Sequence, residues 1–256
     1  MEPRQGAPAA REGGTIDRDE VERFARQAHA WWDENGPFRP LHRLNPARLR
    51  FIRARLQQHF AREHADELAP FTGLRLLDIG CGGGLVSEPM ARLGFAVHGI
   101  DADANALAVA RAHAEETGLV IEYRADSVEE LAARGATYDA VLALEVAEHA
   151  ADAALFLATA AALVAPGGAL VASTINRTAR AFVTTVVGAE YVLRWLPRGT
   201  HQWRKFLRPS EMAGHLRHAG MNVAAIEGLN FHPLSGDWAL GRDLGVNYLL
   251  IARKPK

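Results

Sequence analysis

The fold of this chain is decided by one stretch, Leu74-Arg75-Leu76-Leu77-Asp78-Ile79-Gly80-Cys81-Gly82-Gly83-Gly84-Leu85. Its apolar first half is typical of a strand buried in a parallel sheet. The glycines that follow predict a tight turn, leading into a helix that begins near Leu85. Because glycine has no side chain, a ligand can approach the backbone of this turn closely.

Two carboxylates frame the glycine turn. Asp78 ends the first strand, and Asp101 follows the next apolar run, Ala96 to Ile100. Ligands of open parallel sheets bind outside the carboxyl ends of the strands, and an acid about 20 residues after the turn is placed for ribose hydroxyls. Asp78 is placed to meet an amine or a hydroxyl. The arrangement therefore predicts an adenosine site.

The glycine spacing separates two adenosine cofactors, NAD and S-adenosylmethionine. The dinucleotide fingerprint requires glycines at positions i, i+2 and i+5. The third position is Leu85 when the count starts at Gly80, and Ser87 when it starts at Gly82. The run from Asp78 to Gly84 instead resembles the nucleotide loop of class I methyltransferases. We therefore expect S-adenosylmethionine to bind against Gly80 and Gly82, and a dehydrogenase is disfavoured.

The composition indicates a globular protein with one sizeable core, since 48% of the 256 residues are hydrophobic and 23% are charged. The net charge of -1 gives no overall attraction to nucleic acid. Cys81 is the sole cysteine, which excludes an intrachain disulfide and favours the cytoplasm. We expect residues 1–18 to form a disordered tail and 19–256 a methyltransferase domain. No apolar run reaches the ~18 residues of a membrane span.

Helical periodicity precedes the glycine turn, and residues 19–66 are expected to form a helical cap. The pattern predicts a helix over 19–32 whose two tryptophans either anchor it on the sheet or line a substrate pocket. A second helix is expected to be capped by Asn45, with Pro46 in its first turn. Its Arg48 is placed to reach a carboxylate. The apolar face of the first helix comprises Val21, Phe24, Ala28, Trp31 and Trp32.

After the turn, strands and helices alternate, which predicts a parallel sheet with helices on both faces. Further strands are expected at 96–100, 120–123, 138–144, 169–174, 221–228 and 246–252, and helices at 103–117, from 127, at 152–164 and at 209–219. A loop without a helix joins the last two strands, so the final strand should be antiparallel. The expected fold is α/β: a Rossmann-like, seven-stranded, mostly parallel class I methyltransferase sheet, with an N-terminal helical extension and a helical insertion after strand 5.

The chemistry is expected where the fourth strand ends, in Leu144-Glu145-Val146-Ala147-Glu148-His149. Methyl transfer is an in-line displacement, so the protein has to orient the acceptor and remove its proton. A phenol, with a pKa of ~10, needs a base or a divalent cation at pH 7. Glu145, Glu148 and His149 are therefore predicted as catalytic residues and as candidate ligands of Mg²⁺ or another divalent cation. Alternatively, Glu145 accepts backbone amides and His149 faces water.

Two other regions carry polar or amphipathic signals. Asp126, just past the third strand, is placed to accept from the adenine amino group or to stabilise a turn. The segment 176–207 is typical of a lid or membrane-surface element, although its apolar face would also suit packing on the core. That segment combines apolar residues at helical spacing with cations: Phe182, Val183, Val186, Val187, Tyr191 and Trp195; Arg177, Arg180, Arg194, Arg198, Arg204 and Lys205.

Several motifs resemble the ubiquinone-biosynthesis O-methyltransferase family: Trp31-Trp32-Asp33, Phe38 to His42, Asn45-Pro46, the 78–84 loop, Val187 to Tyr191, Pro197 to His201 and Val246-Asn247-Tyr248. The resemblance extends over residues 21–252. It implies methyl transfer from S-adenosylmethionine to phenolic hydroxyls of polyprenylated precursors, at two steps of the pathway. It further implies cofactor contacts at Arg48, Gly80, Asp101 and Leu144. Eukaryotic relatives imply a metal at Glu145, Glu148 and His149.

The resemblance also implies where the protein works. A polyprenylated phenol or quinol stays in the bilayer, so we expect peripheral contact with the inner face of the cytoplasmic membrane and with other enzymes of the pathway. Gln202 departs from the family pattern, where an aspartate is expected, as do Ala147 and Ala150. Two rivals remain: an O-methyltransferase of another small phenol, and a lipid-binding or scaffold subunit with a vestigial cofactor pocket.

Overall fold

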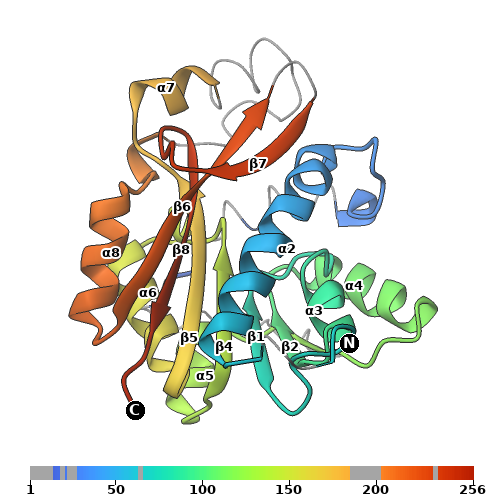
Figure 1. Cartoon of the computed structure of the whole chain (residues 1–256). Helices are drawn as coiled ribbons and strands as arrows, with labels where there is room; N and C mark the ends of the chain where they lie inside the picture. Colours follow the sequence, from blue (N-terminus) through green and yellow to red (C-terminus); the bar gives the residue numbers. More distant parts are fainter. Residues whose placement is uncertain (1–13, 18–20, 22–27, 63–65, 185–202, 233–235) are drawn as a thin grey trace, which may run out of the picture.

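One mixed sheet of eight strands organises the fold, in the order β3-β2-β1-β4-β5-β8-β6-β7 (Figure 1). The computed structural model describes residues 14–17, 21, 28–62, 66–184, 203–232 and 236–256. The first five strands pair in parallel, and β8 runs antiparallel to both β5 and β6. The strands are β1 (Arg75–Ile79), β2 (Ala96–Ile100), β3 (Glu122–Arg124), β4 (Tyr138–Leu144), β5 (Val164–Ile175), β6 (Asn222–His232), β7 (Asp237–Gly241) and β8 (Asn247–Arg253).

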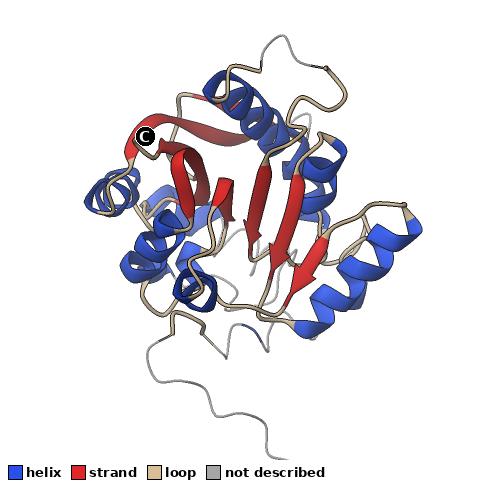
Figure 2. Ribbon diagram, turned by 90° about the horizontal axis from the view of Figure 1, so that it is seen from below, coloured by secondary structure: helices blue, strands red, loops and turns tan. Residues whose placement is uncertain are grey.

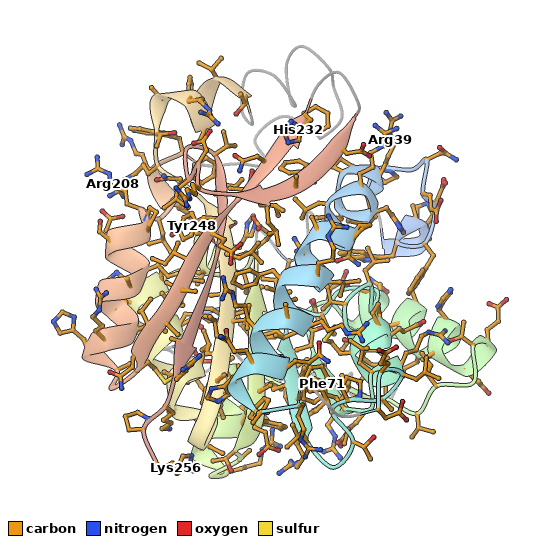
Figure 3. The ribbon with its side chains drawn as sticks, viewed as in Figure 1. Arg39, Phe71, Arg208, His232, Tyr248 and Lys256 are labelled. Carbon is orange, nitrogen blue, oxygen red and sulfur yellow. The ribbon has the colours of Figure 1, made fainter. Side chains whose placement is uncertain are left out.

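Helices cover both faces of the sheet (Figure 2). Neighbouring strand residues point to opposite faces, so Leu77 joins a core under α5, α6 and α8, whereas Leu76 joins a core under α2 and α3. Tyr248 of β8 is fully buried inside the molecule and donates to the Leu207 carbonyl at 3.0 Å (Figure 3). The helices are α2 (Arg39–His59), α3 (Ser87–Arg92), α4 (Ala104–Glu116), α5 (Val128–Ala133), α6 (Ala153–Ala162), α7 (Ala179–Ala181) and α8 (Pro209–His218), with 3-10 turns η1 (Ala28–Ala30), η2 (Ala147–His149) and η4 (Trp203–Lys205).

The predicted parallel sheet with an antiparallel last strand is confirmed, but β7 adds an eighth strand to the seven expected. Strand β6 continues to His232, and β7 folds back to pair with it. The sequence between the expected strands carries Pro233 and Gly236, which favour a loop. The strand itself is only five residues long, too short for a clear alternating pattern.

Helix α2 begins at Arg39, seven residues before the start at Pro46 predicted from a cap at Asn45. Pro40 occupies the first turn, where a missing backbone N–H costs nothing. Pro46 therefore lies inside the helix, and the Asn45 side chain caps nothing: its Nδ2 donates instead to the Leu85 carbonyl at 2.8 Å. This bond fastens α2 beside the glycine turn.

The cap and the insertion are described only in part. Of the helix expected over 19–32, the structure describes residue 21 and residues from 28 on, and residues 185–202 of the insertion lie outside the described residues. Within the expected disordered tail, Thr15 is buried and its hydroxyl donates to Glu129 at 2.7 Å. Among the described residues, no helix is both long and apolar enough to cross a membrane.

Candidate active site

A cavity of about 1540 Å³ opens at the carboxyl ends of the parallel strands. The residues predicted from the sequence to bind a cofactor or to carry chemistry all contribute to its lining. They are Arg48, Asp78, Gly80, Gly82, Asp101, Asp126, Leu144, Glu145, Glu148 and His149. The cavity thus brings together predicted site residues from helix α2 and from the ends of β1, β2 and β4.

The glycine turn is locked to the end of β2. The amides of Gly80 and Cys81 both donate to the Ile100 carbonyl, at 2.8 and 3.0 Å. Gly80 has a φ of +68°, and a Cβ there would lie 2.5 Å from Val146. Any side chain at this position would therefore meet both backbone strain and a collision.

The sole cysteine, Cys81, is buried in this turn, among the residues that line the cavity. Cys81 packs in a small cluster with Leu107 and Tyr123. Burial, together with the nearby carboxylates of Asp78 and Asp101, raises the pKa of the thiol well above its ordinary value. The thiol therefore stays protonated and serves packing.

Asp101 braces the turn while facing the cavity. One carboxylate oxygen accepts from the Gly82 amide and the other from the Asp103 amide, each at 2.8 Å. Burial raises the pKa of Asp101, and these two backbone bonds oppose the rise. Each carboxylate oxygen can accept more than one bond, so the group retains capacity for ribose hydroxyls.

Asp78 is a buried acceptor at the end of β1. Its Oδ2 accepts from the Ser87 hydroxyl at 2.6 Å. Burial raises the pKa of Asp78 to about 6, because the Ser87 bond and the charge of Arg48 offset only part of the desolvation. A cationic ligand such as an ammonium would favour the ionised form.

Arg48 presents a buried guanidinium with unused donors. The residue is 5% exposed, and its Nε and Nη2 have no hydrogen-bond partner in the described structure. Burial lowers the pKa of Arg48, opposed by Glu145, Asp78 and Glu148. Buried unpaired donors of this kind suit a planar anion. The methionine carboxylate of S-adenosylmethionine fits this requirement, and its ammonium fits Asp78.

Glu145 is held in a strained position at the end of β4. Its φ is +54°, in the left-handed region that non-glycine residues seldom adopt. Two bonds with Ser173 hold it there: the Glu145 amide donates to the Ser173 carbonyl at 3.0 Å, and the Ser173 hydroxyl donates to Oε1 at 2.8 Å. Strain of this kind is typical of functional sites. Ser173 lies on the neighbouring strand β5, so no local sequence pattern indicates this contact.

Glu148 and His149 follow in the short turn η2. Glu148 is 4% exposed, and burial together with Glu145 raises its pKa well above the ordinary value. His149 is half-buried and lines the cavity. Glu148 therefore favours its protonated form, which is not suited to accept a proton from a ligand.

The structure does not bring Glu145, Glu148 and His149 together as a metal-ligand set. The described part of the chain contains no group of three or more His, Cys, Asp or Glu side chains arranged to hold a metal ion. The Glu145 carboxylate is engaged by Ser173, and Glu148 favours its protonated form. In this arrangement the three side chains therefore do not form a metal-binding group.

The remaining cofactor candidates occupy the cavity wall. Asp126 has its Oδ2 2.8 Å from Nη2 of Arg134, which supports the turn-stabilising interpretation for that oxygen. Leu144 is 8% exposed at the end of β4. An adenine contact at either residue stays a prediction.

Trp31 is a cavity residue whose role the sequence left open. Its ring stacks on Phe38, with centroids 3.8 Å apart and planes at 8°. A Cβ on Gly82 or Gly83 would lie 2.5 Å from Trp31. The indole thus covers the glycine turn from the cavity side.

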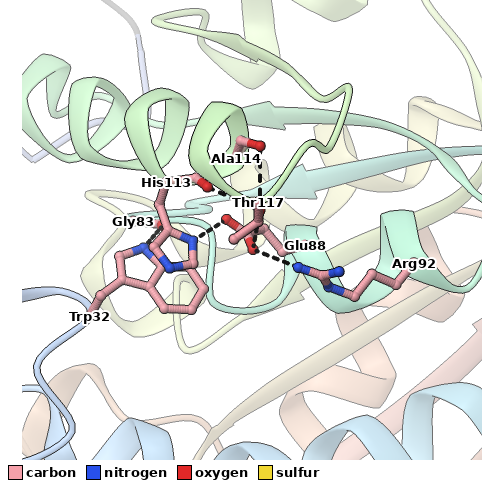
Figure 4. Close-up of polar contacts among 7 residues, drawn as sticks. All are labelled: Trp32, Gly83, Glu88, Arg92, His113, Ala114 and Thr117. Carbon is pink, nitrogen blue, oxygen red and sulfur yellow. Dashed lines mark hydrogen bonds and ion pairs between the residues drawn. The ribbon is translucent and has the colours of Figure 1, made fainter.

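Trp32 anchors the same segment from outside the cavity (Figure 4). Its Nε1 donates to the Gly83 carbonyl at 2.9 Å, and its ring stacks on His113 at 3.5 Å. His113 in turn shares a 2.6 Å hydrogen bond with the buried Glu88. The partners come from α3 and α4, far apart in the chain, so no local pattern could indicate them.

Comparisons with known proteins agree with this geometry. Residues 49–226 match a family described as a methyltransferase domain. The chain is 50% identical over 243 residues to the ubiquinone biosynthesis O-methyltransferase of Methylobacterium nodulans, covering 95% of this chain and 97% of that protein. The enzyme of the same name from Paramagnetospirillum magneticum is 51% identical over 241 residues, covering 94% and 96%.

A solved structure shows the same fold at low identity. The magnesium protoporphyrin IX methyltransferase of Synechocystis PCC 6803, with bound SAH, aligns with a TM-score of 0.61 and 19% identity, covering 93% of this chain and 100% of that one. The fold and the matched methyltransferase domain define a class I S-adenosylmethionine-dependent methyltransferase. Within that class, the chain belongs to the ubiquinone biosynthesis O-methyltransferase family.

Proposed function

We propose that this protein transfers the methyl group of S-adenosylmethionine to phenolic hydroxyls of polyprenylated ubiquinone precursors, at both O-methylation steps. One observation carries the proposal: the predicted donor contacts and the proton-accepting groups line a single continuous cavity. Relatives that are half identical over nearly the whole chain support the choice of acceptor.

Three side chains bind different parts of the donor. The Asp101 carboxylate accepts from the ribose hydroxyls, the Arg48 guanidinium donates to the methionine carboxylate, and the Asp78 carboxylate pairs with the ammonium. When bound, S-adenosylmethionine supplies an activated methyl group and its own leaving group. The chain therefore needs only to orient the acceptor oxygen and to remove its proton.

We assign proton removal to His149. It lines the cavity and is half-buried, whereas the Glu145 carboxylate is engaged by Ser173 and Glu148 favours its neutral form. A neutral imidazole has one ring nitrogen with a free lone pair, which can accept the proton of the phenol. No step is routed through a metal ion.

We also propose peripheral contact with the inner face of the cytoplasmic membrane through the insertion. Phe182 and Val183 are 41% and 58% exposed, which is unusual for large apolar side chains side by side. Two cations of the insertion are less available to a membrane surface than the sequence indicated. Arg177 pairs with Glu211, and Arg180 pairs with Asp243. Liposome sedimentation of the double variant Phe182→Ser, Val183→Ser against wild type tests this contact, with equal pelleting opposing it.

The acceptor is tested by a turnover assay with a catechol-headed quinol analogue and S-adenosylmethionine, with and without chelator. We expect methylation that chelator does not abolish. Donor binding without methylation of this analogue would favour the alternative, an O-methyltransferase of another small phenol. Activity that chelator removes and Mg²⁺ restores would require Glu145, Glu148 and His149 to rearrange into a metal site.

A further inference from the structure

The hairpin formed by β6 and β7 turns an apolar face toward the cavity. Leu229 lies opposite Leu240, and Phe231 lies opposite Trp238. Because side chains alternate along a strand and directly paired residues share a face, these four point the same way. All four line the cavity, and the rings of Phe231 and Trp238 are 5.4 Å apart.

Helix α2 provides the facing wall. Leu41, Leu44 and Arg48 are spaced at i, i+3 and i+7, which places them on one side of the helix, and all three line the cavity. Leu44 belongs to the same core cluster as Leu229, and Leu41, Trp238 and Leu240 pack against that cluster. The apolar part of the cavity thus lies between α2 and the hairpin.

The polarity of this wall changes along the helix. Arg48, next to Glu145, marks the end where the donor and the reacting oxygen meet. Leu41 lies seven residues earlier, about 10 Å along the axis. Arg39 and His232, at the outer ends of α2 and β6, both line the cavity and lie at the same end of the molecule (Figure 3). The apolar walls therefore connect the reacting centre with a polar outer rim.

We propose that these apolar walls bind the hydrocarbon tail of the methyl acceptor. We define the tail subsite as Leu41, Phe231, Trp238 and Leu240, which are half-buried and line the cavity, with the buried Leu44 and Leu229 packed behind them. This inference rests on the proposed function. The tail leaves the ring beside Glu145 and His149 and runs outward between α2 and the hairpin. Burial of its methylenes against these residues supplies affinity without dictating the ring substituents. One tail subsite therefore suits two acceptors that differ only in the ring.

The test compares two acceptors, a catechol without a tail and the same catechol bearing a farnesyl chain. In wild type we expect a lower KM for the farnesylated acceptor. Trp238→Ala should raise that KM by about tenfold, as removal of a hydrophobic pocket wall does, while kcat and KM for the tail-less acceptor stay within twofold. Trp203→Ala is the matched control, because that tryptophan is exposed and does not line the cavity.

A second variant guards against misfolding. Leu240→Trp keeps the apolar character of β7 but fills the subsite, so it should raise the KM of the farnesylated acceptor selectively. Farnesol, a tail without a ring, should compete with the farnesylated acceptor in wild type and lose that effect in both variants. Calorimetry compares the Kd of S-adenosylmethionine between each variant and wild type, and we expect no difference.

The outcomes separate the two proposals. If a variant slows both acceptors equally, or if farnesol does not compete, the tail subsite is wrong while the proposed function stands. If wild type binds S-adenosylmethionine but methylates neither acceptor, the proposed function itself is wrong.

Discussion

Nη2 of Arg48 lies 3.9 Å from Oε1 of Glu145 inside the protein, yet Nη2 donates no hydrogen bond to any residue that the structure describes. The two charges attract each other without completing a bidentate pair. Glu145 is instead oriented by the Ser173 hydroxyl, which leaves the guanidinium directed to the cavity. This incomplete pair links the donor site to the end of β4, where the acceptor is expected.

Replacing Arg48 should weaken binding of the methionine part of the donor without affecting binding of its adenosine part. Arg48→Lys keeps the charge but loses the planar fork that matches a carboxylate. We expect the Kd of S-adenosylhomocysteine, measured by calorimetry, to rise by roughly 10- to 100-fold, the range for a lost bond to a charged group.

The ligand and residue controls for Arg48 are both available. 5′-Methylthioadenosine lacks the methionine carboxylate, so its Kd should not change. Arg50→Lys alters an exposed arginine two residues along α2 and should leave both affinities intact. Equal weakening of both ligands by Arg48→Lys would contradict a carboxylate contact.

Donor affinity should depend on pH through Asp78. Burial raises the pKa of this carboxyl to about 6 in the free protein, so below that pH it is largely protonated. A bound ammonium favours the carboxylate, which means that binding below pH 6 must release a proton. Affinity is therefore full above pH 6 and falls as pH drops, by up to about tenfold per unit.

Calorimetry from pH 5 to 8 measures this dependence. Asp101 also has a raised pKa, so Asp78→Asn is needed to assign the effect. The variant should bind the donor more weakly at pH 8 and show a flatter profile. A profile as steep as that of wild type would remove Asp78 from donor recognition.

His149→Ala should abolish turnover and spare donor binding. Loss of a general base costs about a hundredfold or more. The Kd of S-adenosylmethionine should stay within a few-fold, because the donor contacts lie on other residues. His218→Ala, an exposed histidine of α8, is the control for an unspecific effect. Unchanged turnover of the quinol analogue by His149→Ala would exclude the residue from the mechanism.

Trp32→Ala should lower the free energy of unfolding. The substitution removes a stacked ring pair with His113 and the bond to the Gly83 carbonyl, together worth about 2 kcal/mol. Trp32→Phe keeps a ring for the stack and should recover about half. Urea titration with and without donor provides the measurement. Leu68→Ala, at a side chain that is 81% exposed, should stay within about 0.5 kcal/mol of wild type, and an equal loss there would show that the effect of Trp32→Ala is unspecific.

The sheet could be predicted because its strands are buried on both faces. Every residue of β4 but Asp139 is buried, so the sequence reads as one continuous apolar run. The helix predicted from 127 is confirmed as α5, and Ser127 caps it through reciprocal bonds with Glu130. Local signals of this kind also located the glycine turn and the acids beside it.

Other features depend on contacts that a local pattern does not contain. Asn45 and Pro46 look like a helix start, but Pro40 provides an equally good one earlier, and the bond from Asn45 to Leu85 is tertiary. The Trp32 stack on His113 joins residues from separate elements. Most of the insertion, including Val187 to Tyr191, lies outside the described residues, so its predicted helix stays a prediction.

The burial of Cys81 has a chemical consequence. Catechols and quinols oxidise readily to quinones, which are electrophiles that thiolates attack. The only sulfhydryl in this sequence belongs to the glycine turn, among the residues that line the cavity, yet Cys81 is 7% exposed, packs in one cluster with Tyr123, and has a raised pKa that keeps the thiol protonated. The catalyst is thereby protected from alkylation by the oxidised forms of its own proposed substrates.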